Sequence, residues 1–250
     1  MRWRISHVAS TGSTNADARD GKPGDVFTAD FQTAGRGRLD HKWLSAPGEN
    51  LIMSVVLDVA GAAPDQVATL PLVVGLAAVE GLAALLPPPP GLSLKWPNDV
   101  LVGGRKLAGI LCERHGDIVV AGIGVNVRQR AFAPEIADRA TSLSLLGSAA
   151  DPVSARDAVL VPLGGLYSQW RREGFAALHS RICAVDCLKG GFVRVLQTDA
   201  DASPAEGMCG GIAEDGSLVV AGRRVYAGEA HVANASAICA DRGVVISSEK

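Results

Sequence analysis

The chain lacks any marked excess of charge of one sign. Its 250 residues include 24 lysines and arginines against 26 aspartates and glutamates, a formal net charge of −2. Without an overall basic field, a protein does not attract nucleic acid or an anionic membrane surface as a whole. We therefore expect no nucleic acid or membrane partner, and any phosphate binding must depend on local loops.

Cysteine is scarce, and none of the cysteines forms a CxxC pair. An odd number of cysteines without paired spacing argues against a zinc site and against a secreted disulfide framework. The five histidines likewise show no spacing typical of metal ligands. The first residues lack the apolar stretch and cleavage site of a signal peptide. Together these absences predict a cytoplasmic protein with reduced thiols. The five cysteines are Cys112, Cys183, Cys187, Cys209 and Cys239.

Long apolar runs are also few. The longest, from Val67 to Leu86, contains Pro71 and Glu80 and has no basic flank, which favours a buried helix over a membrane span. The prolines at 87–90 are expected to end this helix. With 48% hydrophobic and 20% charged residues, the chain can bury a substantial core in one large or two smaller domains.

The rest of the chain alternates between helical and strand-like segments. A short helix is expected over 13–19, and a longer one over 154–172 that begins at Ser154 with Asp157 in its first turn. Segments rich in β-branched residues between turn formers predict strands over 25–32, 51–59, 92–96, 100–102, 106–114 and 118–127. Past Arg181, short strands over 191–197, 208–213, 218–221 and 224–226 suggest a small β-barrel.

Residues 32–38, Gln-Thr-Ala-Gly-Arg-Gly-Arg, form the most informative segment. Glycine permits close backbone approach, so successive N–H groups can converge on phosphate oxygens. Each arginine adds a permanent charge and a planar fork of donors that matches phosphate or carboxylate. The segment therefore suits an anionic ligand, although a basic surface turn has the same composition.

Three further polar clusters interrupt an otherwise apolar sequence. They are Ser13-Thr14-Asn15, then KWPND at 95–99 followed by KLAGI at 106–110, then GIGVN at 122–126. Each has an ordinary alternative, because the first suits a helix cap, the second a turn and the third a strand with close-packed glycines. Lys106 alone would pass for a solvated lysine, and Trp43 alone for a core aromatic.

In this combination and order, the clusters resemble those of the biotin protein ligases. Those enzymes carry GRGR, KWPND, KLAGI and GxGxN segments in the same order along the chain. The match is dense over about residues 10 to 130. It implies an α+β fold: a mixed, mainly antiparallel sheet with packed helices as the catalytic domain, and a small SH3-like β-barrel after it. We expect these over 1–181 and 182–236, with a tail over 237–250. Because the first cluster begins at Ser13, no room remains for an N-terminal helix-turn-helix.

The resemblance also implies roles for individual residues. Lys106 would contact the biotinyl carboxylate and the α-phosphate and is expected to be catalytic, together with Arg38. Two anions must meet in this reaction, so fixed positive charge is needed where charge builds up in the transition state. Asp99 would hold Mg²⁺. The expected ligand-binding set is Ser13, Thr14, Asn15, Gln32, Gly35, Arg36, Gly37, Arg38, Trp43, Lys95, Asn98, Asp99, Lys106, Gly109, Ile110, Gly122, Gly124 and Asn126.

Within that set, Ser13, Thr14 and Gln32 would hydrogen-bond biotin, while Trp43 would stack on adenine and Asn126 would read the edge of the base. The glycines would leave room for the ligand. Arg36 and Arg38 would clamp it from a loop that closes on binding. Asp40 and His41 depart from the family pattern, in which glycine and arginine are frequent at these positions.

The expected activity is that of a biotin–protein ligase, which forms biotinyl-5'-AMP from biotin and MgATP and then biotinylates a lysine of a biotin carboxyl carrier domain. One alternative is a lipoate–protein ligase, but a dithiolane ring would want only apolar contacts, and the pocket residues are polar. Another is a non-catalytic biotinyl-AMP sensor, which would need a DNA-binding element. Monomer and homodimer are both left open.

Overall fold

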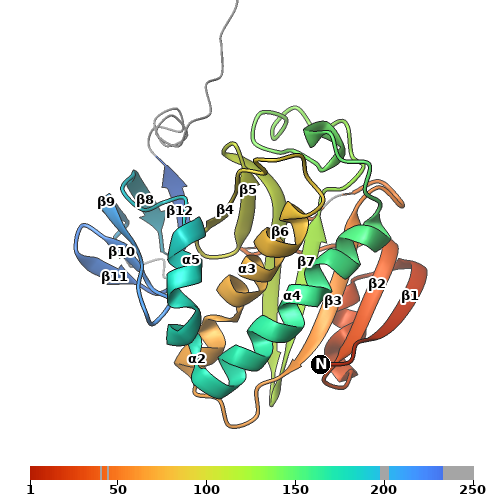
Figure 1. The fold of residues 1–250 in the computed structure, drawn as a ribbon, viewed down its shortest axis with the longest axis horizontal. Coiled ribbons are helices and arrows are strands. Elements are labelled where there is room, and N and C mark those ends of the chain that lie inside the picture. The colour runs from red at the N-terminus through yellow and green to blue at the C-terminus, as the bar shows by residue number, and fades with distance from the viewer. Residues whose placement is uncertain (40, 44, 198–202, 233–250) are drawn as a thin grey trace, which may run out of the picture.

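The larger part of the molecule is built on a seven-stranded sheet (Figure 1). The computed structural model describes residues 1–39, 41–43, 45–197 and 203–232. The strand order is β1-β2-β3-β7-β6-β5-β4; β1 and β2 run parallel, and the other neighbouring pairs run antiparallel. The strands are β1 (Arg4–Thr11), β2 (Asp25–Gln32), β3 (Leu51–Asp58), β4 (Leu92–Lys95), β5 (Asp99–Val102), β6 (Arg105–His115) and β7 (Ile118–Val125).

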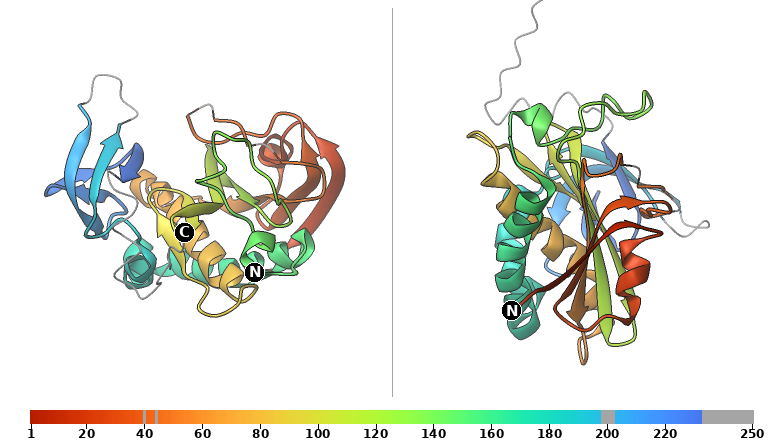
Figure 2. Two further views of the ribbon diagram at one scale, coloured as in Figure 1. Left: turned by 90° about the horizontal axis from the view of Figure 1, so that it is seen from above. Right: turned by 90° about the vertical axis from the view of Figure 1, so that its right-hand side faces the viewer.

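Helices cover both faces of this sheet. The long helices α3 (Leu70–Ala83) and α4 (Pro152–Glu173) pack together on one face, and the short α1 (Thr14–Asp17) lies on the other (Figure 2). The smaller helices are α2 (Pro64–Ala68), α5 (His179–Val185), η1 (Ala18–Asp20), η2 (Ser144–Leu146) and η3 (Phe175–Leu178). The mixed, mainly antiparallel sheet with packed helices is therefore confirmed.

The apolar run expected to form one buried helix forms two. By length and composition Pro64–Ala83 would pass for a membrane span, but 72% of its apolar window is buried within the fold, as a core helix is. The helix breaks at Thr69 because Pro71 has no N–H with which to continue the bonding of α2. It also ends at Ala83, before the prolines that were expected to stop it.

The start expected for α4 at Ser154 is wrong. The helix begins at Pro152, and the capping side chain is Asp151, which accepts a hydrogen bond of 2.8 Å from Ser154 N. Proline suits the first helical position, where its missing N–H costs nothing, and this moves the start toward the N-terminus. The apolar residues Val159, Leu160, Leu163 and Leu166 of α4 are all buried.

The two long helices approach each other most closely at Gly81. A Cβ at this position would lie 2.0 Å from the carbonyl oxygen of Ala158. Pro162, four residues after Ala158, has no N–H to bond that oxygen within α4. The glycine of α3 therefore leaves the backbone of α4 room at the turn that proline disturbs.

The C-terminal part is a five-stranded antiparallel sheet of order β11-β10-β9-β8-β12, consistent with the expected SH3-like domain. It packs beside the β4 end of the large sheet, and Trp96 Nε1 donates to Gly216 O at 3.0 Å across the junction (Figure 2). The division at 181/182 stays a prediction, and the expected tail lies outside the described residues. The strands are β8 (Phe192–Leu196), β9 (Ala205–Ile212), β10 (Leu218–Val220), β11 (Arg223–Val225) and β12 (Glu229–Val232).

Strands β1 and β12 and helix α5 had no signal in the sequence pattern. Strand β1 is exposed along almost its whole length, so its residues show no alternation of apolar and polar positions. Strand β12 has four residues and α5 has seven, which is too short for a clear period.

Candidate functional site

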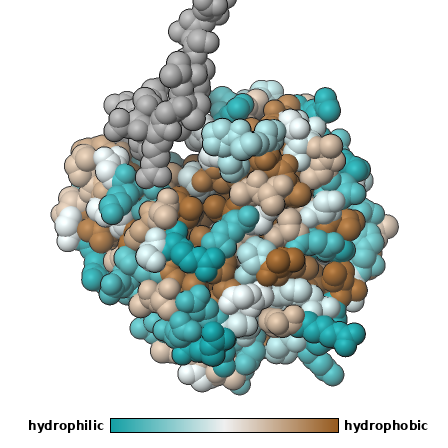
Figure 3. All heavy atoms as spheres, viewed as in Figure 1, coloured by the Kyte–Doolittle hydropathy of each residue, from teal (hydrophilic) through white to brown (hydrophobic). Residues whose placement is uncertain are grey.

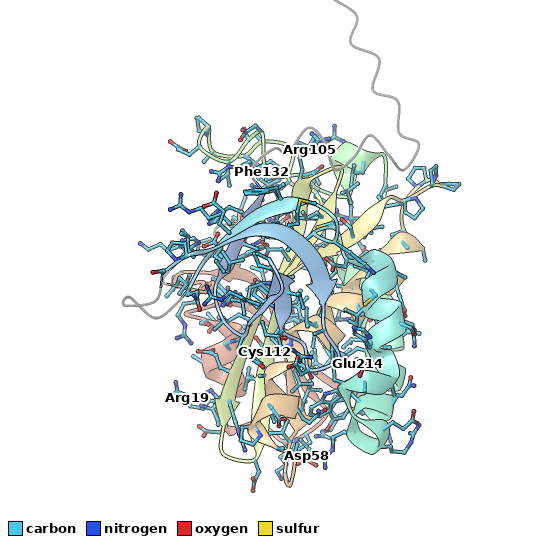
Figure 4. All side chains as sticks on the ribbon, turned by 90° about the vertical axis from the view of Figure 1, so that its left-hand side faces the viewer. Arg19, Asp58, Arg105, Cys112, Phe132 and Glu214 are labelled. Carbon is cyan, nitrogen blue, oxygen red and sulfur yellow. The ribbon has the colours of Figure 1, made fainter. Side chains whose placement is uncertain are left out.

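Most of the predicted site residues gather on the α1 side of the large sheet, opposite α3 and α4. They come from α1, from the end of β2, from the neighbouring strands β6 and β7, and from the segment 33–43, which we call the ligand loop. Figure 4 marks two positions on β6, Arg105 at its start and Cys112 near its other end, and the site residues Lys106 to Gly109 lie between them.

A buried hydrogen-bonded network forms one end of the site, which we call the head pocket (Thr14, Asn15, Gln32 and Ser54). Thr14 N donates to Gln32 Oε1 at 2.7 Å, and Thr14 Oγ1 lies 3.0 Å from the same oxygen. Ser54 Oγ lies 2.7 Å from Thr14 Oγ1 and 2.6 Å from Asn15 Oδ1. A Cβ at Gly122 would lie 2.3 Å from Asn15 Oδ1, so any larger residue there would displace the Asn15 amide.

The ligand loop folds back on itself as a tight hairpin. Trp43 N donates to Gly35 O at 3.1 Å, and Gly37 N donates to His41 O at 2.6 Å. A Cβ at Gly35 would lie 2.5 Å from Trp43 O and 2.8 Å from Gln32 Nε2, so this glycine lets the loop close against the head pocket. The expected effect of Asp40 on the loop lies outside the described residues.

The Trp43 indole packs against Gly109 of β6 and Gly124 of β7, which are neighbouring strands. A Cβ at Gly124 would lie 2.5 Å from the indole, and one at Gly109 would lie 3.4 Å from it. Lys106 Nζ is 6.0 Å from the ring centroid, at the limit of a cation–π contact. The indole Nε1 is buried and has no hydrogen-bond partner in the part of the chain that the structure describes. A buried donor without a partner is costly, and an acceptor on a ligand would remove that cost.

The two arginines of the loop are held by different partners. Arg36 Nη2 lies 3.0 Å from Oε1 of Glu113, a residue of β6. Arg38 Nη1 donates to Gly228 O of the C-terminal part at 3.1 Å and to Asn98 Oδ1 at 3.4 Å. Burial lowers the pKa of Arg38, and the nearby carboxylates of Asp99 and Glu229 partly offset this. The guanidinium thus stays charged in a partly buried place.

Lys106 forms an ion pair with Asp99, in which Nζ lies 2.7 Å from Oδ1. The backbone of Lys106 is also fixed: its N donates to Arg139 O at 2.7 Å, and its O accepts from Thr141 N at 2.9 Å. Because the side chain is 38% exposed, its amine can turn from Asp99 toward a ligand. The arrangement places a partly exposed cation on a strand whose backbone is hydrogen-bonded.

The side chains of several predicted site residues bond to, or pack against, the protein itself. Asn126 Nδ2 donates to Thr141 O at 2.9 Å, which holds the segment after β7 beside Lys106. Ile110 is 2% exposed and belongs to the core, although its backbone bonds to Asn98. Lys95 lies opposite Asp99 in the β4–β5 ladder. Ser13 is buried at the start of α1, where its side chain makes no capping hydrogen bond.

Two residues of the network were missed in the sequence. Ser54 is a polar residue within the apolar strand β3, and that contrast was a usable signal. Glu113 lies two residues after Leu111 and four after Gly109, so it shares their face of β6, but nothing local distinguishes it from a surface carboxylate. Among the described residues, no group of three or more histidine, cysteine, aspartate or glutamate side chains forms a metal cage.

Comparison with known proteins agrees with this geometry. Residues 9–129 match the model of the biotin/lipoate A/B protein ligase family. The chain is 33% identical to the biotin–[acetyl-CoA-carboxylase] ligase of Paracoccus denitrificans over 87% of this chain and 95% of that protein. It is 44% identical to the ligase of the same name from Mycobacterium tuberculosis, over 68% of this chain and 66% of that one.

A solved structure with the same architecture is that of the biotin protein ligase from Aquifex aeolicus in complex with biotin and ATP. It has a TM-score of 0.80 and 30% identity, over 91% of this chain and 97% of that one. The chain spans about half to two thirds of the length of the first curated relatives it matches. On the family match, the full-length relative and the shared fold, the chain belongs to the biotin protein ligases.

Proposed function

We propose that the chain joins biotin to AMP, using ATP, and then transfers the biotinyl group to a lysine of the carrier domain of a biotin-dependent carboxylase. The observation that carries this is the layout of the site. A head pocket of amide and hydroxyl groups lies at one end, and Lys106 and Arg38 supply cations at the other. Biotin has the same polarity, with a ureido ring at one end and a carboxylate at the other.

In the first step, a carboxylate oxygen of biotin attacks the α-phosphorus, an O–P bond forms, and the bond to pyrophosphate breaks. The two reactants are both anions, so their approach needs fixed cations. Lys106 would leave Asp99 and bridge the carboxylate and the α-phosphate. Arg38 would neutralise charge from the other side, and the closed ligand loop would keep water from the mixed anhydride.

In the second step, the amine of the acceptor lysine attacks the acyl carbon, the C–O bond to AMP breaks, and the amine gives up a proton. The cations that balanced the first transition state would also stabilise AMP as the leaving group. The carrier domain of a carboxylase is the proposed acceptor.

The residues present fit a magnesium ion at Asp99. Mg²⁺ is commonly held by one or two carboxylates together with substrate phosphates, so it does not need a cage of protein ligands. Asp99 Oδ1 is buried and faces Lys106 Nζ at 2.7 Å, and it would lose this partner when Lys106 turns toward the phosphate. Asp99 would supply the protein ligand, and the ion would neutralise charge on the phosphates.

The remaining proposals concern the context of the enzyme. We place catalysis in residues 1–181, assign 182–236 to the SH3-like domain, and place the protein in the cytoplasm, with either a monomer or a homodimer as the working form. The four described cysteines are free, and burial raises the pKa of Cys112 and Cys187 to about 12, which suits inert thiols.

The test is an incubation of purified protein with MgATP, a biotin carboxyl carrier domain, and either biotin or lipoate, read by the intact mass of the acceptor. A mass gain with biotin alone supports the proposal. A gain with lipoate alone would assign the chain to the lipoate branch of the family. Tight binding of biotin without any gain would favour a non-catalytic sensor.

A further inference from the structure

Glu113 of β6 lies between two parts of the site that are otherwise separate. Its Oε2 accepts a hydrogen bond of 2.6 Å from Asn15 Nδ2 in the head pocket and one of 3.1 Å from Arg36 Nη2 in the ligand loop. Its side chain is only 23% exposed, so the charge is not simply a solvated surface group. Glu113 does not contact Lys106, Arg38 or Asp99, the residues that we assign to phosphate chemistry.

The contact with Asn15 fixes the orientation of an amide. The two protons on Nδ2 point to Glu113 Oε2 and, at 3.4 Å, to Leu111 O, while Oδ1 faces Ser54 Oγ at 2.6 Å. A flipped amide would place its oxygen against a carboxylate and a carbonyl, which is unfavourable on both contacts. The negative charge of Glu113 therefore decides which way Asn15 points.

That orientation also gives Ser54 an acceptor in the head pocket. Ser54 Oγ donates to Asn15 Oδ1 at 2.6 Å and lies 2.7 Å from Thr14 Oγ1, which donates to Gln32 Oε1 at 3.0 Å. Thr14 and Gln32 are the residues proposed to meet the ureido ring. Through Asn15 and Ser54, the carboxylate of Glu113 is thus connected to Thr14 and Gln32 by a chain of hydrogen bonds.

The contact with Arg36 ties the ligand loop to the same carboxylate. Nη2 of Arg36 lies 3.0 Å from Oε1 and 3.1 Å from Oε2, so one guanidinium nitrogen reaches both oxygens. Arg36 is about half exposed, and an ion pair of this exposure contributes only weakly to stability. Such a contact is strong enough to favour a closed loop and weak enough to open during turnover.

We propose that Glu113 is a positioning residue that couples the head pocket to closure of the ligand loop. The inference rests on the proposed function in that biotin is taken as the ligand of the pocket. Closure through Arg36 is favoured when Asn15 is correctly oriented, because both groups share one carboxylate.

Two substitutions separate the two contacts. Glu113→Gln keeps an oxygen that can accept from Asn15 but loses the charge that holds Arg36. Glu113→Ala loses both contacts. The matched control is Glu206→Ala in β9, whose carboxylate lies 3.9 Å from Arg194 on the C-terminal sheet. Biotin affinity is measured by calorimetry, and amide hydrogen exchange of peptides that cover the ligand loop is measured with and without biotin.

We expect Glu113→Ala to weaken biotin binding about tenfold, the factor that corresponds to one lost charge-assisted hydrogen bond. Glu113→Gln is expected to change biotin affinity less than about threefold. Both variants should speed exchange in the loop about twofold to fivefold, in the free protein as well, which is the factor expected of an exposed ion pair. Glu206→Ala should change neither quantity.

A biotin affinity and a loop exchange rate within twofold of wild type in Glu113→Ala would overturn the inference. So would equal effects of Glu113→Ala and Glu206→Ala, since that would indicate a general loss of stability. If the wild-type protein binds no biotin, the proposed function fails instead, and the exchange rates of the free protein still decide whether Glu113 holds the loop.

Discussion

Lys106 is the side chain on which the proposed chemistry depends most. Its backbone is fixed on β6 while its amine is paired with Asp99 and partly exposed. Lys106→Ala should lower the rate of biotinyl-AMP formation about 100-fold to 1000-fold, the range seen when one preorganised electrostatic group is removed. Adenylate formation is measured by release of pyrophosphate.

The neighbouring Arg105 is exposed and serves as the control for Lys106. Arg105→Ala should retain close to the wild-type rate. Adenylate formation at the wild-type rate in Lys106→Ala would remove Lys106 from its assigned role, whatever the effect of the control.

Asp215 in the C-terminal part makes a second prediction at this scale. Burial opposes its ionisation, but hydrogen bonds from Ser217 and the ion pair with Arg224 outweigh that and lower its pKa to about 2. A carboxyl with a lowered pKa stabilises the fold above its unfolded pKa, and this contribution is lost as the pH falls through the folded pKa. We expect Asp215→Asn to be less stable than wild type at pH 6, with the difference shrinking between about pH 4 and pH 2.

Urea unfolding of both proteins across this pH range measures the contribution of Asp215. A stability difference that stays constant down to pH 2 would show that the carboxylate charge is not its source.

Among the elements, the pair α3 and α4 makes the sharpest steric prediction. Gly81→Ala places a methyl group against Ala158 O and should destabilise the protein by about 1 to 3 kcal/mol, the usual cost of overpacking a core. Gly165→Ala in α4 meets nothing within 4 Å and should instead stabilise it by roughly 0.5 to 1 kcal/mol, because alanine is the better helix former. Urea titration of the two variants measures both changes in the free energy of unfolding, which should have opposite signs. A stable Gly81→Ala would mean that the helices separate readily.

The elements also show where sequence patterns carry information. Strands β2 to β7 were predicted within one or two residues, because each combines apolar content with flanking turn formers. Strand β1 was missed because it is solvated on both faces, and the start of α4 was misplaced because Ser154 and Asp151 are both good caps by residue type. Local preference ranks such residues equally, and the geometry of the proline between them decides.

For the molecule as a whole, the junction between the two sheets is the feature to test. Trp96 is 2% exposed, and its indole N–H donates to Gly216 O, so the KWPND segment contacts the C-terminal part. Trp96→Phe removes this donor and leaves the carbonyl without it. We expect a loss of about 1 to 3 kcal/mol, the cost of an unsatisfied buried group, and faster hydrogen exchange in β9 and β10. Unchanged exchange there would show that this bond does not hold the sheets together.

Among the described residues, the outer surface over α3, α4 and α5 shows no comparable cluster of functional side chains. Apolar and polar residues are interspersed over that face in Figure 3, and Val161 of α4 is 79% exposed. Scattered exposed apolar residues are normal on a folded protein. The functional groups are concentrated instead at the junction of loop, sheet and C-terminal part.

The sequence by itself determined the class of fold, the polar segments and the family resemblance, because turn chemistry, apolar periodicity and motif spacing are local. Tertiary structure alone decided the partners of those segments. Glu113 meets Asn15 across 98 positions, and Arg38 meets Gly228 across 190. Such contacts depend on strand register and on the packing of the two sheets, which no short segment encodes, and so nothing local in the sequence marks Glu113 as the partner of Asn15 and Arg36.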